Sequence, residues 1–143
     1  MSESSDTIAE IMSVDLVTVT EEQRLSHVRQ LMSEHKIHHV PVVRDGACIG
    51  LISSTDLMRV NWGDLYSQTE AVTDALLDTV SIRDAMQEDL RVIHRDTSVV
   101  EAARLFADGM YHSLPVVDDD DRLVGMLTTT DLLRYLLRFA PGA

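Results

Sequence analysis

The sequence of 143 residues is poor in residues that crosslink or interrupt a chain, with one cysteine, three prolines and six glycines. The single cysteine, Cys48, excludes an intrachain disulfide, and its apolar neighbours Ala47 and Ile49 indicate a buried structural thiol. No apolar run reaches the roughly 18 residues of a membrane span, and the N-terminus lacks the basic start and apolar run of a signal peptide. We therefore expect a soluble, cytoplasmic protein.

Basic residues are also scarce. The chain has 12 Lys and Arg against 24 Asp and Glu, a net charge of −12 and an isoelectric point near 4.7. Lys and Arg supply most of the affinity for nucleic-acid backbones and for anionic membrane surfaces. We predict that the chain binds neither nucleic acid nor membranes, although backbone N–H groups can still bind a small anion.

The residues that are present describe a globular protein, with 45% hydrophobic and 25% charged side chains. The length suits one ordinary domain or two closely packed halves, each too short to bury a good core alone. Any internal repeat is therefore expected to form halves that share a core.

The main feature of the sequence is such a repeat. Val40-Pro41-Val42-Val43 recurs as Leu114-Pro115-Val116-Val117, with an offset of 74 residues. The same offset aligns Met12 with Met86, Asp15 with Asp89, Leu16 with Leu90, Leu31 with Leu105 and His38 with His112. One inserted residue changes the offset to 75 for Gly50 with Gly125, Asp56 with Asp131, Leu57 with Leu132 and Arg59 with Arg134. Chance does not produce so many matches at nearly constant spacing.

Each copy predicts the order strand, helix, strand, strand, helix. β-branched composition indicates the strands, apolar residues at helical spacing indicate the first helix, and a polar turn joins the last two strands. The predicted ranges in the first copy are 16–19, 25–32, 40–43, 49–53 and 56–60. Those in the second copy are 90–93, 99–106, 114–117, 123–128 and 131–139. The fold class predicted is α/β, with two βαββα units.

These motifs resemble the tandem cystathionine β-synthase (CBS) domain pair, also called a Bateman module. The family signature is an apolar-Pro-Val-Val strand, then a strand that ends in Gly-apolar-apolar-(Ser/Thr)-x-x-Asp at a helix start. The first copy has His38-His39-Val40-Pro41-Val42-Val43 and Gly50-Leu51-Ile52-Ser53-Ser54-Thr55-Asp56. The second has His112-Ser113-Leu114-Pro115-Val116-Val117 and Gly125-Met126-Leu127-Thr128-Thr129-Thr130-Asp131. The resemblance implies CBS domains at 7–60 and 79–138, joined by a linker at 61–78.

The resemblance implies two units related by a pseudo-twofold axis, packed sheet to sheet and often assembled as a homodimer. It also implies a regulatory, energy-sensing role, because many members bind AMP, ADP, ATP or S-adenosylmethionine reversibly in two clefts between the repeats, with or without magnesium. No partner domain is visible in the sequence, so the module is expected to act by itself or on an unidentified target protein.

The resemblance further implies clefts built from both repeats. The first cleft would combine His38, Ser53 and Asp56 with Arg91, Tyr111 and His112. The second would combine His112, Thr128 and Asp131 with Val17, Ile37 and His38. In both, the apolar members would sandwich a purine and the histidines would approach the phosphates.

The Ser/Thr-x-x-Asp segment also has a physical reading of its own. A helix N-terminus presents unpaired N–H groups and attracts phosphate, and the hydroxyl of Ser53 or Thr128 can add a hydrogen bond. The carboxylate of Asp56 or Asp131 can accept from ribose hydroxyls. The same pattern is close to a capping box, in which hydroxyl and carboxylate only satisfy the first turn of the helix. The two roles are not exclusive.

Other patterns are weaker. His35, His38 and His39 suggest zinc, but no cysteine or tight carboxylate cluster completes the set, so no metal site is predicted. The run 118–121 of four aspartates lacks the ligand spacing of a calcium loop and is interpreted as a solvated turn. The linker is not rich in Gly or Ser and is predicted to be partly helical. Its Trp62 and Tyr66 fit a partner surface or packing over the clefts or at a dimer seam.

Three functions compete. The first is a regulatory module that senses an adenosine-type ligand, and the second is a dimerising scaffold whose clefts bind no small molecule. An enzyme is the third, and the sequence argues against it, because it contains no recognisable nucleophile motif, phosphate-binding glycine loop or pair of catalytic carboxylates.

Overall fold

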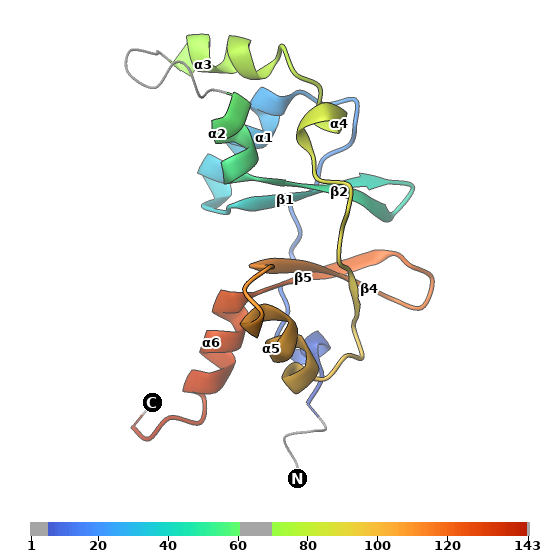
Figure 1. The fold of residues 1–143 in the computed structure, drawn as a ribbon, viewed down its shortest axis with the longest axis vertical. Coiled ribbons are helices and arrows are strands. Elements are labelled where there is room, and N and C mark those ends of the chain that lie inside the picture. The colour runs from blue at the N-terminus through green and yellow to red at the C-terminus, as the bar shows by residue number, and fades with distance from the viewer. Residues whose placement is uncertain (1–5, 61–69, 143) are drawn as a thin grey trace. The chain divides into compact units, whose positions relative to one another are not determined.

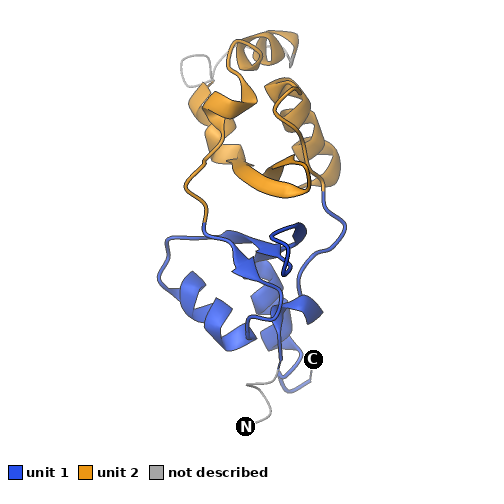
Figure 2. Ribbon diagram, turned by 90° about the vertical axis from the view of Figure 1, so that its right-hand side faces the viewer, with its two compact units in different colours: residues 1–16, 91–143 blue, residues 17–90 orange. Residues whose placement is uncertain are grey.

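The computed structural model describes residues 6–60 and 70–142, which divide into two compact units (Figures 1 and 2). Unit 2 is Val17–Leu90 and carries the hairpin of the first repeat. Unit 1 combines Met1–Leu16 with Arg91–Ala143 and carries the hairpin of the second. The predicted roles of Trp62 and Tyr66 fall outside the described residues.

Unit 2 is an antiparallel hairpin with helices on one face (Figure 1). Its elements are α1 (Leu25–His35), β1 (His39–Arg44), β2 (Ala47–Ser53), α2 (Ser54–Val60), α3 (Glu70–Leu77) and α4 (Ile82–Ala85). Alternate residues of the hairpin point into the core, as the strand period of two requires. The fully buried side chains come from helices and hairpin alike: Leu25, Val28, Val40, Val42, Ile52, Leu77 and Ile82.

Unit 1 repeats this plan around a sheet with the order β3-β4-β5. Its elements are the short 3-10 helix η2 (Ile8–Glu10), β3 (Ile93–His94), α5 (Val99–Ala107), β4 (Ser113–Val117), β5 (Leu123–Thr128) and α6 (Thr129–Leu137). The core again has its own fully buried set: Ile8, Ala102, Leu114, Val116 and Leu127. Each unit therefore has its own apolar core, so the expectation that the two halves share one core is wrong. The predicted mixed α/β class is confirmed.

The helices and hairpins predicted from the sequence are confirmed in both units, but the predicted range of the first strand is wrong in each copy. Within residues 6–60 and 70–142, residues 16–19 contribute only a bridge from Val19 to Val42. In unit 1 the strand is β3, and it covers only Ile93–His94 instead of 90–93.

Proline explains why these pairings are short. The Val19 N–H donates to the Pro41 carbonyl at 3.0 Å, and the Val43 N–H donates to the Val19 carbonyl at 2.8 Å. Extending this parallel ladder toward residue 17 requires an N–H at position 41, and proline has none. Pro115 ends the pairing of β3 with β4 in the same way, because Ile93 lies opposite Val116.

Each repeat lends its N-terminal segment to the hairpin of the other repeat. In unit 1, Ser13 exchanges two backbone hydrogen bonds with Met126 of β5, at 2.9 and 3.0 Å. In unit 2, Gln87 makes the same exchange with Leu51 of β2, at 2.9 and 3.0 Å. Two segments far apart in the sequence therefore pair with the equivalent strands β5 and β2 through the same pattern of backbone hydrogen bonds.

The glycines of the repeated motif are required by this exchange. A Cβ atom on Gly125 would lie 2.4 Å from the Met12 sulfur, and one on Gly50 would lie 2.2 Å from the Met86 sulfur. Both distances are far below van der Waals contact. The methionine of each lent segment thus packs directly on the backbone of a hairpin.

Part of the linker belongs to unit 2. The Arg29 guanidinium donates to Asp74 at 2.7 Å, and the Ser26 N–H donates to Asp78 at 3.0 Å, which ties α3 to α1. The predicted domain boundaries, 7–60 and 79–138, stay a prediction.

Within residues 6–60 and 70–142, none of the helices has the length and apolar composition that crossing a bilayer needs.

We predict that Gly125→Ala lowers the free energy of unfolding by about 1–3 kcal/mol, because the added methyl group overlaps the Met12 side chain. Urea unfolding followed by circular dichroism measures the change. Met12→Ala removes the side chain that the new methyl group would overlap. Gly125→Ala should therefore lower the free energy of unfolding by less in the Met12→Ala background than in the wild type. An unaltered stability in Gly125→Ala would show that the close packing is absent.

Candidate functional site

The two aligned Ser/Thr-x-x-Asp turns lie where the last strand of each hairpin passes into a helix. In unit 1, Thr128 is the N-cap of α6: its hydroxyl accepts from the Asp131 N–H at 3.2 Å. The Asp131 carboxylate in turn accepts from the Thr128 N–H at 2.8 Å through Oδ2. This reciprocal pair is a capping box, so the capping role anticipated for this segment is present.

The matching turn in unit 2 is bonded more extensively. Asp56 Oδ2 accepts from the Ser53 N–H at 2.8 Å and from the Ser53 hydroxyl at 3.0 Å. Asp56 Oδ1 accepts from Arg59 Nη1 at 2.9 Å and from Gln87 Nε2 at a longer 3.4 Å. The residue is only 3% exposed, so its charge is buried but fully hydrogen-bonded.

The histidines chosen from the sequence adjoin these turns. The His38 carbonyl accepts from the Ser54 N–H at 2.9 Å, and the His112 carbonyl accepts from the Thr129 N–H at 3.2 Å. Both histidines are exposed. Within each unit, the structure therefore brings the predicted histidine, hydroxyl residue and aspartate together.

The remaining predicted residues divide between the units. Val17 and Ile37 belong to unit 2 and are half-buried, with Ile37 packed against the core. Arg91 and Tyr111 belong to unit 1, where Arg91 is exposed and Tyr111 packs against the core. Each predicted cleft takes residues from both units, and its assembly stays a prediction.

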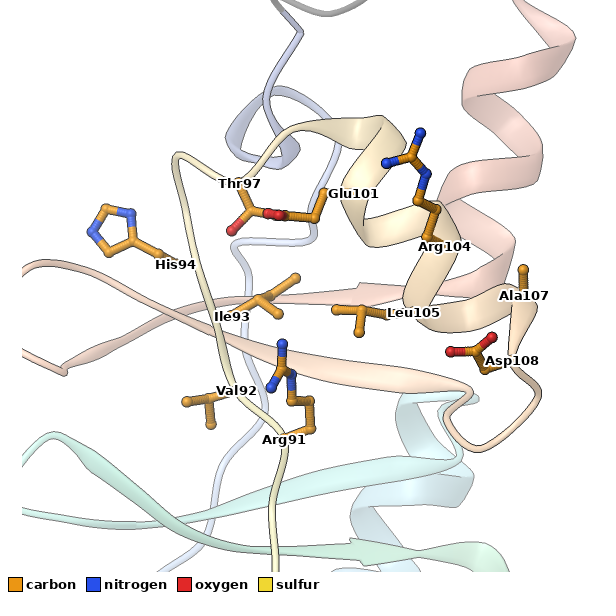
Figure 3. Close-up of a pocket in the computed structure, with 10 residues that line it drawn as sticks. All are labelled: Arg91, Val92, Ile93, His94, Thr97, Glu101, Arg104, Leu105, Ala107 and Asp108. Atoms are coloured by element: carbon orange, nitrogen blue, oxygen red, sulfur yellow. The ribbon is translucent and has the colours of Figure 1, made fainter.

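Arg91 opens onto a pocket of about 690 Å³ that lies entirely in unit 1 (Figure 3). One wall is the chain around β3 and the other is α5, whose Arg104 and Glu101 also line the pocket (Figure 3). Sequence reasoning missed the α5 side, because its charged residues have the ordinary spacing of a solvated helix face. Both basic and acidic side chains line the pocket, so its charge favours neither an anionic nor a cationic ligand.

A second group that sequence reasoning missed is His94 with Asp96 and Asp119, whose ligand atoms lie within 4.8 Å of one another. The carboxylates face opposite ring nitrogens: Asp119 lies 2.5 Å from Nε2, and Asp96 lies 3.6 Å from Nδ1. Because Nδ1 accepts from the Asp96 N–H at 3.1 Å, Nε2 is the nitrogen that donates to Asp119. These hydrogen bonds account for the group without a metal ion.

The acidic run around Asp118 forms a turn, as interpreted from the sequence. Asp118 Oδ1 accepts from the N–H groups of Arg122 and Asp120 at 3.0 and 2.9 Å. These backbone hydrogen bonds, that from Arg122 first, lower the pKa of the Asp118 carboxyl. One aspartate thus fixes the turn while its neighbour Asp119 contacts His94.

The thiol of Cys48 is structural. It donates to the Gly50 carbonyl at 3.3 Å, and burial raises its pKa. A raised pKa keeps the thiol protonated and reduces its nucleophilicity at neutral pH.

The geometry of two aligned half-sites on two similar units agrees with sequence comparison. A sequence model of the CBS domain matches residues 8–63 and 82–138, and the chain therefore belongs to the CBS domain family. A CBS domain-containing protein of Dictyostelium discoideum is 29% identical over 132 residues, which cover 92% of this chain and 91% of that protein.

Solved structures agree with this assignment. CBSX2 in complex with AMP has a TM-score of 0.79 and 26% identity, and the match covers 93% of this chain and 97% of that one. The CBS domain pair of protein MJ0100, in complex with 5′-methylthioadenosine and S-adenosyl-L-methionine, has a TM-score of 0.70 and 25% identity. That match covers 91% of this chain and 98% of the other.

Several relatives are much longer than the matched region. The chain spans 48% of protein MJ1225 of Methanocaldococcus jannaschii, at 26% identity, and 23% of a homoserine O-acetyltransferase of Methanocorpusculum labreanum, at 29% identity. CBS pairs are generally regulatory, and the relatives named as enzymes share only part of their length with this chain.

We predict that, without ligand, Asp56→Asn destabilises the protein by about 2–3 kcal/mol, because an amide cannot accept from all of its donors. Asp131→Asn should cost less than about 1 kcal/mol, since the amide oxygen can still accept the single Thr128 N–H. Urea unfolding of the two variants measures the difference. Equal destabilisation by both changes would contradict the hydrogen bonding described for the two turns.

Proposed function

We propose that the chain is a regulatory module that binds an adenosine-type nucleotide, AMP, ADP or ATP, in clefts between its two CBS repeats. The observation that carries this proposal is the Thr128–Asp131 turn, which places a hydroxyl and a carboxylate at the start of α6. The similarity to a CBS pair bound to AMP supports the choice of ligand class.

The chemistry of the turn fits a nucleoside phosphate. Helix α6 has nine residues, and its N-terminus carries the partial positive charge that favours a phosphate in an otherwise acidic chain. The Asp131 carboxylate provides an acceptor for ribose hydroxyls. His112, whose carbonyl bonds the first N–H of the helix, is exposed beside it and can donate to a phosphate.

S-adenosylmethionine is the second candidate ligand, because a related CBS pair binds it together with 5′-methylthioadenosine. It shares adenine and ribose with AMP but has a cationic sulfonium in place of the phosphate. The net charge of −12 does not disfavour such a cation. A ligand screen must therefore include it.

We also propose that the module forms a homodimer and acts on a target protein instead of catalysing a reaction. An apolar groove of about 280 Å³ lies between α5 and α6 in unit 1. Leu133 and Leu136 line it and are 59% and 61% exposed, and exposed apolar side chains that adjoin one another favour a protein contact. A dimerising scaffold without a small-molecule ligand would use the same surface, so this groove does not separate the two functions.

The test is a thermal-unfolding screen against AMP, ADP, ATP, S-adenosylmethionine and guanosine nucleotides, with and without magnesium. A ligand at 100 times its Kd adds about 2.7 kcal/mol, which raises the midpoint by roughly 5–10 °C for a chain of this size. We expect a rise with adenosine compounds and none with guanosine compounds. No rise with any of them at millimolar concentration would favour the scaffold function.

A further inference from the structure

The two aligned turns differ in one respect that the repeat does not predict: how many of their hydrogen-bonding groups are already used. In the Ser53–Asp56 turn, both carboxylate oxygens of Asp56 accept from protein donors, and Arg59 and Gln87 hold Oδ1. A ribose hydroxyl could reach Oδ1 only by displacing them. Helix α2, which follows this turn, has only seven residues.

The Thr128–Asp131 turn leaves an acceptor open. Asp131 Oδ2 accepts from the Thr128 N–H, while Oδ1 has no hydrogen-bond partner among residues 6–60 and 70–142. The residue is half-buried, where Asp56 is buried. Arg134 aligns with Arg59, yet it is exposed and forms no ion pair with Asp131 within the described chain.

The lent segments explain part of this contrast. Gln87 and Ser13 occupy aligned bridge positions, beside β2 and β5 respectively. The long amide of Gln87 reaches Asp56, whereas the serine at position 13 has a much shorter side chain. The segment beside β2 therefore supplies a hydrogen-bond donor to Asp56, and the segment beside β5 supplies none to Asp131 among the described residues.

A second, independent feature marks the same turn. Ser113 is 6% exposed, and its hydroxyl has no hydrogen-bond partner in the described residues. It lies directly opposite Thr128 in the β4–β5 register, and opposed residues of an antiparallel pair place their side chains on one face of the sheet. Buried hydroxyls are almost always hydrogen-bonded, so this one lacks the partner that a ligand would supply.

We propose that the chain has one working nucleotide site, built on Ser113, Thr128 and Asp131, and that the Ser53–Asp56 turn is closed by its own contacts and serves stability. This inference rests on the proposed nucleotide-binding function and specifies which site performs it. A ribose hydroxyl donates to Asp131 Oδ1, and the Ser113 hydroxyl pairs with a polar atom of the same ligand.

Isothermal titration of the full chain with AMP, ADP and ATP in turn tests the proposal. The wild type is expected to bind one nucleotide per chain. Asp131→Asn should weaken binding at least about tenfold, the effect of losing one hydrogen bond to a charged acceptor. Asp56→Asn is the matched control, and its affinity should stay within about threefold of wild type at a temperature where circular dichroism shows it folded.

Ser113→Ala separates a ligand contact from simple packing. Removing a buried hydroxyl without a partner should leave the unfolding midpoint of the free protein unchanged or higher. If Ser113 contacts the ligand, the same variant should bind the nucleotide more weakly although the free protein is at least as stable as the wild type. An Ala variant that binds as tightly as wild type would remove Ser113 from the site.

The outcomes distinguish this inference from the proposed function. No binding of any nucleotide to the folded wild type would overturn the function itself. Two nucleotides per chain, one lost in Asp56→Asn and one in Asp131→Asn, would preserve the function and overturn the single-site inference. Loss of binding in Asp56→Asn alone would place the working site on the other turn.

Discussion

The exchange of N-terminal segments between the repeats determines what surrounds each site. Residues 8–13 complete the sheet of unit 1, and residues 82–87 complete that of unit 2, through the backbone bonds of Ser13 and Gln87. Met12 and Met86 fix these segments by packing on glycine. Because the segments differ in sequence, the exchange gives two similar sheets but different neighbours for the two aspartates.

The two aligned turns of this duplicated fold differ in their hydrogen bonding. Both turns retain the hydroxyl and carboxylate that begin a helix, so both retain the capping that local stability needs. Their surroundings differ: Asp56 accepts from Arg59 and Gln87, and Asp131 has no equivalent donor among residues 6–60 and 70–142. A satisfied buried carboxylate stabilises the fold, whereas an open one next to a hydroxyl without a partner is suited to a ligand.

Local pattern was sufficient to predict most elements of the fold. Apolar spacing predicted α1 and α5, and the Pro-Val-Val repeat located both hairpins, because these signals are carried by neighbouring residues. The first strands were overpredicted at 16–19 and 90–93. Their β-branched composition was clear, but the partner positions Pro41 and Pro115 lack the N–H that a longer ladder needs.

The site was predictable in composition but not in its hydrogen bonding. The motif identified Asp56 and Asp131 as equivalent, and the family resemblance gave them the same role. Their difference depends on Gln87, which lies 31 residues from Asp56 in sequence, and on the backbone pairing that brings it there. The missing partner of Ser113 is likewise a property of tertiary packing that no sequence pattern carries.

A crystal structure of the protein grown with saturating AMP tests the central claim most directly. The account predicts one nucleotide per chain, with a ribose hydroxyl within about 3 Å of Asp131 Oδ1 and a polar ligand atom at the same distance from the Ser113 hydroxyl. Asp56 would keep its contacts with Ser53 and Arg59. A nucleotide bound to Asp56, with Arg59 displaced and the Thr128–Asp131 turn empty, would contradict it.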